Sequence, residues 1–212
     1  MDNGDLARRL RLIVLTDRKL AAPADVTTVV SHALAAGAPA VQLRNKGDSA
    51  RELLSVGRDL RALTREADAL FFVNDRLDVA LALDADGIHL GPHDLPLAAA
   101  RSAAPPGFLI GCSADDPEVA RAAVADGADY IGCGTVYPTT TKADAGDVVG
   151  LEGLRRVGES VPVPVVAIGG ITPERASEVA ATGVAGIAVV GAVMAAPDPA
   201  KAVRQLLAPF NA

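Results

Sequence analysis

Three polar side chains with a two-residue spacing are the first candidates for chemistry in this sequence. Gln42, Arg44 and Lys46 occupy alternate positions at and beyond the end of a short apolar run. In an extended strand, this spacing sends all three side chains to the same face. An arginine and a lysine that are withdrawn from water need anionic partners. A structural salt bridge to a neighbouring carboxylate would meet that need, but three polar groups in register favour a bound anion.

Two carboxylates follow the next two apolar runs. Asp75 comes directly after the third run, and Asp94 comes shortly after the fourth. They could simply pair with Arg44 and Lys46. However, Mg²⁺ is usually held by one or two carboxylates together with substrate phosphate, so the same carboxylates also suit a metal site. These four residues therefore predict a site that binds a diphosphate together with Mg²⁺.

Hydroxyl groups and one further lysine follow the fifth and sixth runs. Ser113 ends the fifth run, and Thr139 and Thr141 lie in the polar loop that leads to Lys142. Such a loop is either a solvated turn or a source of hydrogen-bond donors and positive charge. A Schiff-base lysine should project from a strand into an apolar pocket, and Lys142 instead lies within a polar loop. We therefore expect an electrostatic role for Lys142.

The histidine and the two cysteines give a weaker signal. His89 lies within an apolar run, where a histidine is more often a hydrogen-bonded core residue than a catalytic one. Cys112, Cys133 and the nearby histidines lack the paired close spacing of a zinc site. Two cysteines in a chain of this size do not indicate a disulfide framework, so we expect core thiols in a reducing compartment.

The elements that position these residues follow from eight short apolar runs, each followed by a stretch with helical spacing. Eight strand–helix units in about 200 residues favour a closed (β/α)₈ (TIM) barrel within the α/β class. An open dinucleotide-binding sheet would show a G-x-G-x-x-G turn after its first strand, and that turn is missing. We predict one domain over residues 1–212, with residues 1–11 as an N-terminal extension. The predicted strands are residues 12–16, 40–44, 70–74, 87–91, 109–113, 130–134, 163–168 and 186–191.

Glycines follow the seventh and eighth runs, at Gly170 and Gly191. In many barrels, backbone N–H groups at these points bind a phosphate at the N-terminus of a helix. The sequence therefore predicts a second anion site, for a monophosphate, across the barrel mouth from the diphosphate site. Two phosphorylated substrates could meet between them.

Composition narrows the class of protein. The 212 residues carry a net charge of −6, and aromatic residues make up 3% with no tryptophan, so we expect no nucleic-acid partner. Residues 1–11 are too charged for a secretory signal, and the longest apolar stretch is shorter than the roughly 18 residues of a membrane span. We expect a soluble cytoplasmic protein that acts on small molecules and leave open a homo-oligomer.

With these motifs in place, the chain resembles the thiamine phosphate synthase family from Leu12 to about Leu207. The resemblance rests on QLRNK at 42–46, NDR at 74–76, DGIHLG at 86–91 with Asp94, YPTTTK at 137–142 and IGGI at 168–171. It implies that a hydroxymethylpyrimidine diphosphate is joined to a thiazole phosphate, or to its carboxylated form, with release of diphosphate. The implied route is a dissociative substitution through a pyrimidine cation.

The resemblance also implies residue roles. Mg²⁺ would be bound by Asp75 and Asp94, and the catalytic groups would be Arg44, Lys46, Ser113 and Lys142. The pyrimidine and its diphosphate would contact Gln42, Arg44, Lys46, Asn74, Ser113 and Lys142. The thiazole phosphate would contact Thr139, Thr141, Gly170, Val190 and Gly191. The family usually has serine where this chain has Gly191, so one hydroxyl contact to that phosphate is lost.

Two rival interpretations remain. A thiazole tautomerase is a similar barrel that acts on a single phosphate-bearing thiazole, and it would leave the diphosphate groups unused. A non-enzymatic phosphate-binding barrel would need no metal carboxylates.

Overall fold

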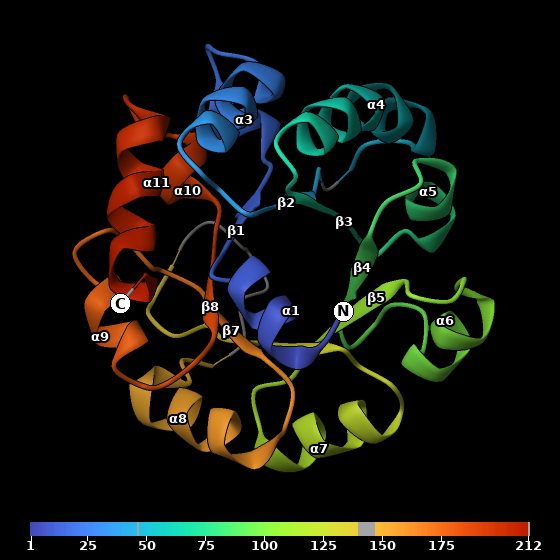
Figure 1. Cartoon of the computed structure of the whole chain (residues 1–212), viewed down its shortest axis with the longest axis vertical. Coiled ribbons are helices and arrows are strands. Elements are labelled where there is room, and N and C mark those ends of the chain that lie inside the picture. Colours follow the sequence, from blue (N-terminus) through green and yellow to red (C-terminus); the bar gives the residue numbers. More distant parts are fainter. Residues whose placement is uncertain (46, 140–146, 212) are drawn as a thin grey trace.

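Eight parallel strands form a closed barrel in the computed structural model, which describes residues 1–45, 47–139 and 147–211 (Figure 1). Each strand pairs with the next along the chain, and the last pairs with the first. The predicted (β/α)₈ barrel is therefore confirmed. The strands are β1 (Leu12–Leu15), β2 (Ala40–Leu43), β3 (Leu70–Asn74), β4 (Gly87–Leu90), β5 (Leu109–Ser113), β6 (Tyr130–Cys133), β7 (Val165–Ile168) and β8 (Gly186–Val189).

Several strands are shorter than the sequence predicts, because the residues after them turn into loops. At the end of β2, for example, the backbone N–H of Arg44 donates to the Thr16 hydroxyl at 2.8 Å rather than to a strand carbonyl. Apolar runs show where a strand lies. The strand ends, however, where a side chain replaces the backbone carbonyl as hydrogen-bond acceptor. The polar residues beyond these ends are therefore loop residues at the mouth of the barrel.

Helices surround the barrel and connect its strands. Their starts follow local sequence signals: Ser49 and Glu52 form a reciprocal capping box, and the Asp116 and Asp198 carboxylates accept backbone N–H bonds just before a proline. The helices are α1 (Asn3–Arg9), α2 (Arg18–Ala21), α3 (Val26–Ala35), α4 (Ala50–Glu66), α5 (Leu77–Ala82), α6 (Leu97–Ala103), α7 (Pro117–Ala125), α8 (Gly150–Ser160), α9 (Ala176–Ala180), α10 (Gly191–Met194) and α11 (Pro199–Leu207), with a 3₁₀ turn at Ala208–Phe210.

Two apolar clusters flank the strands. The larger lies between the outer strand faces and the helices, and the smaller fills the inside of the barrel. Along β1, Leu12 and Val14 belong to the outer cluster, whereas Ile13 and Leu15 belong to the inner one. This alternation is the two-residue period of a strand. It means that every second residue at the end of a strand points into the barrel.

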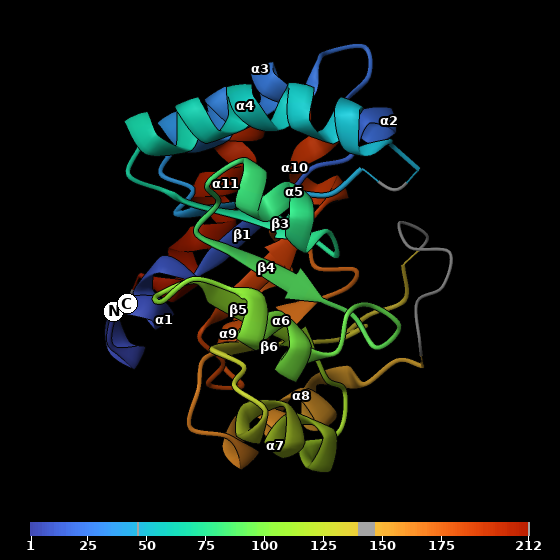
Figure 2. The same cartoon turned by 90° about the vertical axis from the view of Figure 1, so that its right-hand side faces the viewer.

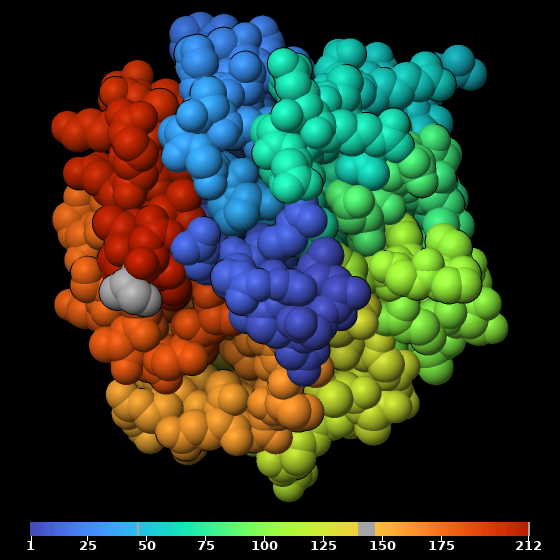
Figure 3. All heavy atoms as spheres, in the orientation of Figure 1, coloured from blue at the N-terminus to red at the C-terminus, as the bar shows by residue number. Residues whose placement is uncertain are grey.

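Helix α1 covers the end of the barrel at which the strands begin. Leu6 and Leu10 are buried in the inner cluster, against side chains of the strands. Figure 2 shows α1 and both chain termini at this end, and Figure 3 shows the N-terminal segment over its centre. The opposite end, to which the strands point, is therefore where a ligand can enter. Among the described residues, no helix is long and apolar enough to cross a membrane.

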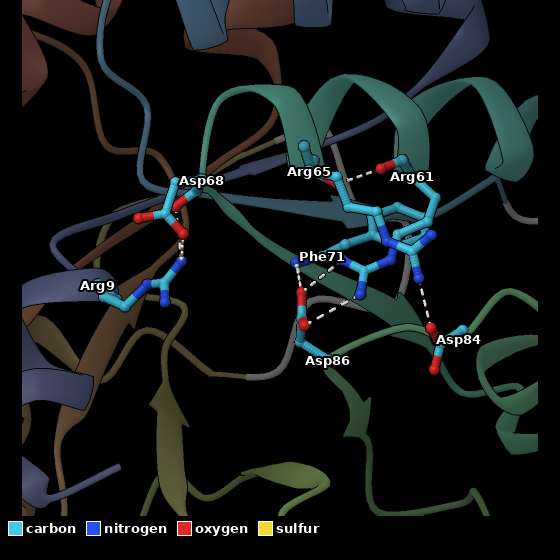
Figure 4. Close-up of polar contacts among 8 residues, drawn as sticks. Arg9, Arg61, Arg65, Asp68, Phe71, Asp84 and Asp86 are labelled. Atoms are coloured by element: carbon cyan, nitrogen blue, oxygen red, sulfur yellow. Dashed lines mark hydrogen bonds and ion pairs between the residues drawn. The ribbon is translucent and has the colours of Figure 1, made fainter.

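Partly buried ion pairs tie the helices to this same closed end (Figure 4). The Asp86 carboxylate, just before β4, accepts the backbone N–H of Phe71 at 2.7 Å and pairs with Arg61 of α4 at 2.9 Å. The arrangement recurs two strands later, where Asp129 accepts the N–H of Ile110 and pairs with Arg101 of α6. Each carboxylate thus holds two neighbouring strands and one helix together.

We expect Arg61→Ala to lower the free energy of unfolding by about 2 kcal/mol, because it leaves the half-buried Asp86 carboxylate without its cation. The matched control is Arg65→Ala, on the same helix, which removes an exposed ion pair to Asp84 and should change stability by less than about 0.5 kcal/mol. Urea unfolding of both variants measures the difference. Equal losses would contradict the role assigned to Asp86.

Candidate active site

Polar side chains from four consecutive strands point into the open end of the barrel. Gln42 on β2 pairs in register with Leu15 and Phe72, which are both inner-cluster residues. Asn74, two residues after Phe72, pairs in register with His89 on β4. Because alternate residues of a strand share a face, these side chains also face inward. Ser113 joins them from β5 through its contact with His89.

Of the predicted ligand-binding residues that the structure describes, Gln42 is the most deeply buried. Its side chain is 3% exposed, and its Oε1 atom has no hydrogen-bond partner among the described residues. A buried acceptor without a partner costs free energy, so a native protein usually provides one through a ligand or water. Arg44 follows in the loop beyond β2 and is half-buried. The predicted Lys46 lies outside the described residues.

The two predicted metal carboxylates are both attached to the end of β4. Asp75 has a left-handed backbone (φ 63°), and its N–H donates to the carbonyl of His89 at 2.9 Å. Asp94 accepts the N–H of Gly91 through Oδ2 at 2.6 Å. The structure therefore brings Asp75 and Asp94 to neighbouring loops at the open end. No group of three or more His, Cys, Asp or Glu side chains that could hold a metal occurs in the described part of the chain.

His89 forms a hydrogen-bonded chain across three strands. Its Nδ1 atom lies 3.1 Å from the Tyr130 hydroxyl, and its Nε2 atom lies 3.0 Å from the Ser113 hydroxyl. Tyr130 is buried, and burial is the largest cause that raises the pKa of its hydroxyl, followed by the charge of Asp129. The expectation that His89 is a hydrogen-bonded inward residue agrees with this geometry. Its link to the predicted site residue Ser113 was not predicted.

Glycines make room for this chain inside the barrel. A Cβ atom on Gly111 would overlap the ring and hydroxyl of Tyr130, and one on Gly132 would lie 2.7 Å from Cε1 of His89. Gly111 is on β5, next to the β6 strand that carries Tyr130, whereas Gly132 is on β6, two strands from His89 on β4. The available sequence signal for these hydrogen bonds was a pair of glycines within predicted strands, Gly111 and Gly132. The motifs described above did not include them.

The predicted phosphate side lies at the ends of β7 and β8. Gly170 has φ 63°, and a Cβ there would lie 2.7 Å from the carbonyl oxygen of Tyr137. Arg175 fixes this turn: it donates to the Gly170 carbonyl at 2.7 Å and lies 4.5 Å from the Tyr137 ring centre. Sequence reasoning gave no role to Arg175. Its position shortly after the IGGI motif was the only available signal.

The other predicted residues on this side are placed as follows. Val190 immediately precedes α10, and Gly191 is its first residue, where backbone N–H groups have no acceptor within the helix. Thr139 is half-buried at the last described position before a gap. Thr141 and Lys142 lie outside the described residues.

The cysteines are packing residues. Cys133 is fully buried, and burial raises the pKa of its thiol to about 12. Burial also raises the pKa of the half-buried Cys112, with smaller contributions from the charges of Asp126 and Asp94. Both therefore remain protonated thiols at neutral pH.

A closed barrel with convergent polar groups at the carboxyl ends of its strands is the arrangement of (β/α)₈-barrel enzymes. The comparisons with known proteins define the family. The model of the family described as thiamine monophosphate synthase matches residues 12–193. The chain therefore belongs to this family, and it is an enzyme of this type.

Relatives with the name thiamine-phosphate synthase are similar to this chain over most of its length. The thiamine-phosphate synthase of Pyrococcus furiosus is 52% identical over 202 residues, which cover 95% of each chain. That of Archaeoglobus fulgidus is 56% identical over 175 residues, which cover 82% of each chain. A solved structure of thiamine phosphate pyrophosphorylase from Pyrococcus furiosus has a TM-score of 0.90 and 50% identity, and the match covers 97% of this chain and 98% of that one.

We expect Gly111→Ala to destabilise the protein by about 3 kcal/mol, because the added Cβ overlaps the Tyr130 ring inside a closed barrel. The control is Gly158→Ala in α8, where the nearest atom is Val184 Cγ1 at 3.5 Å. This control should gain up to about 1 kcal/mol from helix propensity. Thermal unfolding compares the two variants, and a Gly111→Ala protein as stable as the wild type would contradict the packing described here.

Proposed function

We propose that this enzyme joins 4-amino-2-methyl-5-hydroxymethylpyrimidine diphosphate to thiazole phosphate, or to its carboxylated form, and releases diphosphate. The observation that carries the proposal is the buried, unpartnered Oε1 of Gln42 at the open end of the barrel. An aminopyrimidine offers hydrogen-bond donors that suit such an acceptor. The names of the relatives, thiamine-phosphate synthase, describe this class of product.

The diphosphate would lie above β2 to β5. Arg44 supplies a fixed positive charge beyond β2, and Ser113 supplies a hydroxyl at the end of β5. Asn74, paired in register with His89, would add an amide at the same level. Lys46 and Lys142 are proposed as further cations on the evidence of the sequence motifs alone.

Asp75 and Asp94 are proposed to hold Mg²⁺. Two carboxylates on neighbouring loops are too few ligands to enclose the ion, but this donor set suits Mg²⁺ when substrate phosphate oxygens complete its coordination. Once bound, the ion would supply charge that stabilises the departing diphosphate. Backbone hydrogen bonds from Asp75 to His89 and from Gly91 to Asp94 hold the two residues in place before substrate arrives.

The proposed reaction is a dissociative substitution. The bond between the pyrimidine methylene carbon and the diphosphate oxygen breaks, and its electron pair leaves with the diphosphate. The electron-rich aminopyrimidine carries the resulting positive charge, and the lone pair of the thiazole nitrogen then forms the new carbon–nitrogen bond. The protein contributes hydrogen-bond donors and positive charge where negative charge develops, and it holds both substrates together.

The thiazole phosphate would be bound on the other side of the mouth. Backbone N–H groups of Gly170, Val190 and Gly191 are proposed to donate to its phosphate, as helix N-termini and glycine turns commonly do. Thr139 and Thr141 would contact the same substrate. Because Gly191 has no side chain, its contribution to phosphate binding is limited to the backbone.

The direct test supplies purified protein with both phosphorylated substrates and Mg²⁺. Thiamine phosphate and diphosphate should form in equal amounts, and excess EDTA should abolish both, with activity restored by added Mg²⁺. Product formation that is unaffected by EDTA would remove the metal from the proposal. A change in the thiazole phosphate alone, without the pyrimidine substrate, would instead indicate a tautomerase.

We expect Gly170→Ala to raise KM for thiazole phosphate at least about tenfold, because the added Cβ forces the Tyr137–Gly170 turn apart and moves its N–H. The control is Gly183→Ala, which has the same left-handed backbone (φ 84°) but nothing within 4 Å of the new atom. Both variants lose stability to backbone strain, whereas only Gly170→Ala should raise KM. Equal KM values would argue against a phosphate site at this turn.

A further inference from the structure

We propose that Tyr130 and His89 are positioning residues that orient the Ser113 hydroxyl, so that its proton points toward the bound diphosphate. This inference rests on the proposed function for the identity of the anion. It assigns to the buried Tyr130 and the half-buried His89 a task that packing alone does not require. The direction of each hydrogen bond in the chain carries the argument.

Tyr130, at the buried end of the hydrogen-bonded chain, sets the donor-to-acceptor direction. Tyr130 is among the largest fully buried side chains, and its raised pKa keeps the hydroxyl protonated at physiological pH. Within the described part of the chain, this hydroxyl has a single hydrogen-bond partner, Nδ1 of His89, at 3.1 Å. A buried hydroxyl donor without an acceptor costs free energy, so Tyr130 donates and Nδ1 accepts. The neutral ring then carries its proton on Nε2.

The remaining steps follow along the chain. Nε2–H of His89 donates to Ser113 Oγ at 3.0 Å, so one lone pair of the serine oxygen is occupied. The serine proton is therefore free to point away from the histidine, toward the half-exposed mouth of the barrel. In the opposite tautomer, Nε2 would accept the serine proton, and the oxygen lone pairs would face the anion. Tyr130 thus decides whether Ser113 attracts or repels a diphosphate.

The direction of the His89–Ser113 hydrogen bond also distinguishes Ser113 from a nucleophilic serine. In a serine–histidine pair that attacks a substrate, the histidine accepts the serine proton. Here the histidine donates to the serine, and no proton is transferred in the proposed step. Ser113 makes a hydrogen bond that strengthens as charge develops on the departing oxygen, which lowers the barrier rather than only tightening binding.

The first test reads the tautomer directly and needs no activity. In ¹⁵N NMR spectra of the substrate-free wild type, His89 should show a protonated Nε2 and an unprotonated Nδ1. Tyr130→Phe, which removes only the hydroxyl, should shift the ring toward a mixture of tautomers. A wild-type ring protonated on Nδ1 would overturn the proposal. This result stands even if the enzyme fails to form thiamine phosphate, which would overturn only the proposed function.

The second test is a double-mutant cycle in the condensation assay. Tyr130→Phe should lower kcat by about tenfold with little change in KM for thiazole phosphate, which is the loss expected for one buried hydrogen bond that acts in the transition state. In a Ser113→Ala background, the same substitution should lower kcat less than twofold, because its target is already missing. Independent, multiplying effects would show that Tyr130 acts through packing alone.

His89→Gln serves as the conservative variant. Glutamine is a neutral side chain that can both accept from Tyr130 and donate to Ser113, so it should retain more activity than His89→Leu, by at least about fivefold. Circular dichroism and thermal unfolding identify variants that fail to fold, and for those the wild-type NMR result decides the question. Equal activity of the two variants, with both folded, would contradict the positioning role.

Discussion

Closure of eight strands into one barrel is the constraint on which the rest of this structure depends. The interior of such a barrel is only wide enough to be filled by side chains, so each large inward residue needs a small neighbour. Tyr130 and His89 each lie beside a strand glycine, Gly111 and Gly132. Register therefore decides which polar groups can meet. The contact between His89 and Tyr130 exists because Gly111, which pairs in register with both residues, leaves the space inside the sheet to the tyrosine.

The two ends of the barrel use charge in different ways. At the closed end, Asp86 and Asp129 are satisfied by an arginine and a backbone N–H each, so their charges are used within the protein. At the open end, the buried Gln42 Oε1 has no partner among the described residues. A buried acceptor of this kind needs a hydrogen-bond donor, which a ligand or water can supply. The closed end thus contributes to stability, whereas the proposed ligand binding belongs to the open end.

Much of this arrangement could be predicted from local sequence patterns. Each apolar run gave a strand, because a parallel strand buried on both faces needs continuous apolar residues. The two-residue period of a strand also placed Gln42 inside the barrel, because alternate residues share one face. Strand ends were less predictable, since they depend on individual partners such as the Thr16 hydroxyl. The family followed from motifs whose order and spacing are specific, and the comparisons bear it out.

The hydrogen-bonded chain could not be predicted, because it depends on the register between strands. His89, Ser113 and Tyr130 are far apart in the sequence, and only the pairing of β4, β5 and β6 brings them together. A histidine in an apolar run is compatible with a simple core position, and the sequence contains no signal for the atom to which each ring nitrogen bonds. The roles of Lys46, Thr141 and Lys142 remain predictions from motifs, since the structure does not describe these residues.

The hydrogen-bonded Tyr130–His89–Ser113 chain and the half-buried Arg44 would act on the same diphosphate by different physical means. Arg44 lies at the mouth, where water and salt weaken its field, and it would attract the anion in the ground state as well as in the transition state. The hydrogen bonds that end at Ser113 begin at the buried Tyr130, where hydrogen bonds are stronger than in water. Their proposed direction would be fixed before substrate binds. A preorganised donor of this kind avoids reorganisation as the bond breaks. The proposed dissociative reaction would benefit from both, because Arg44 would attract the substrate and the fixed donor would favour its cleavage.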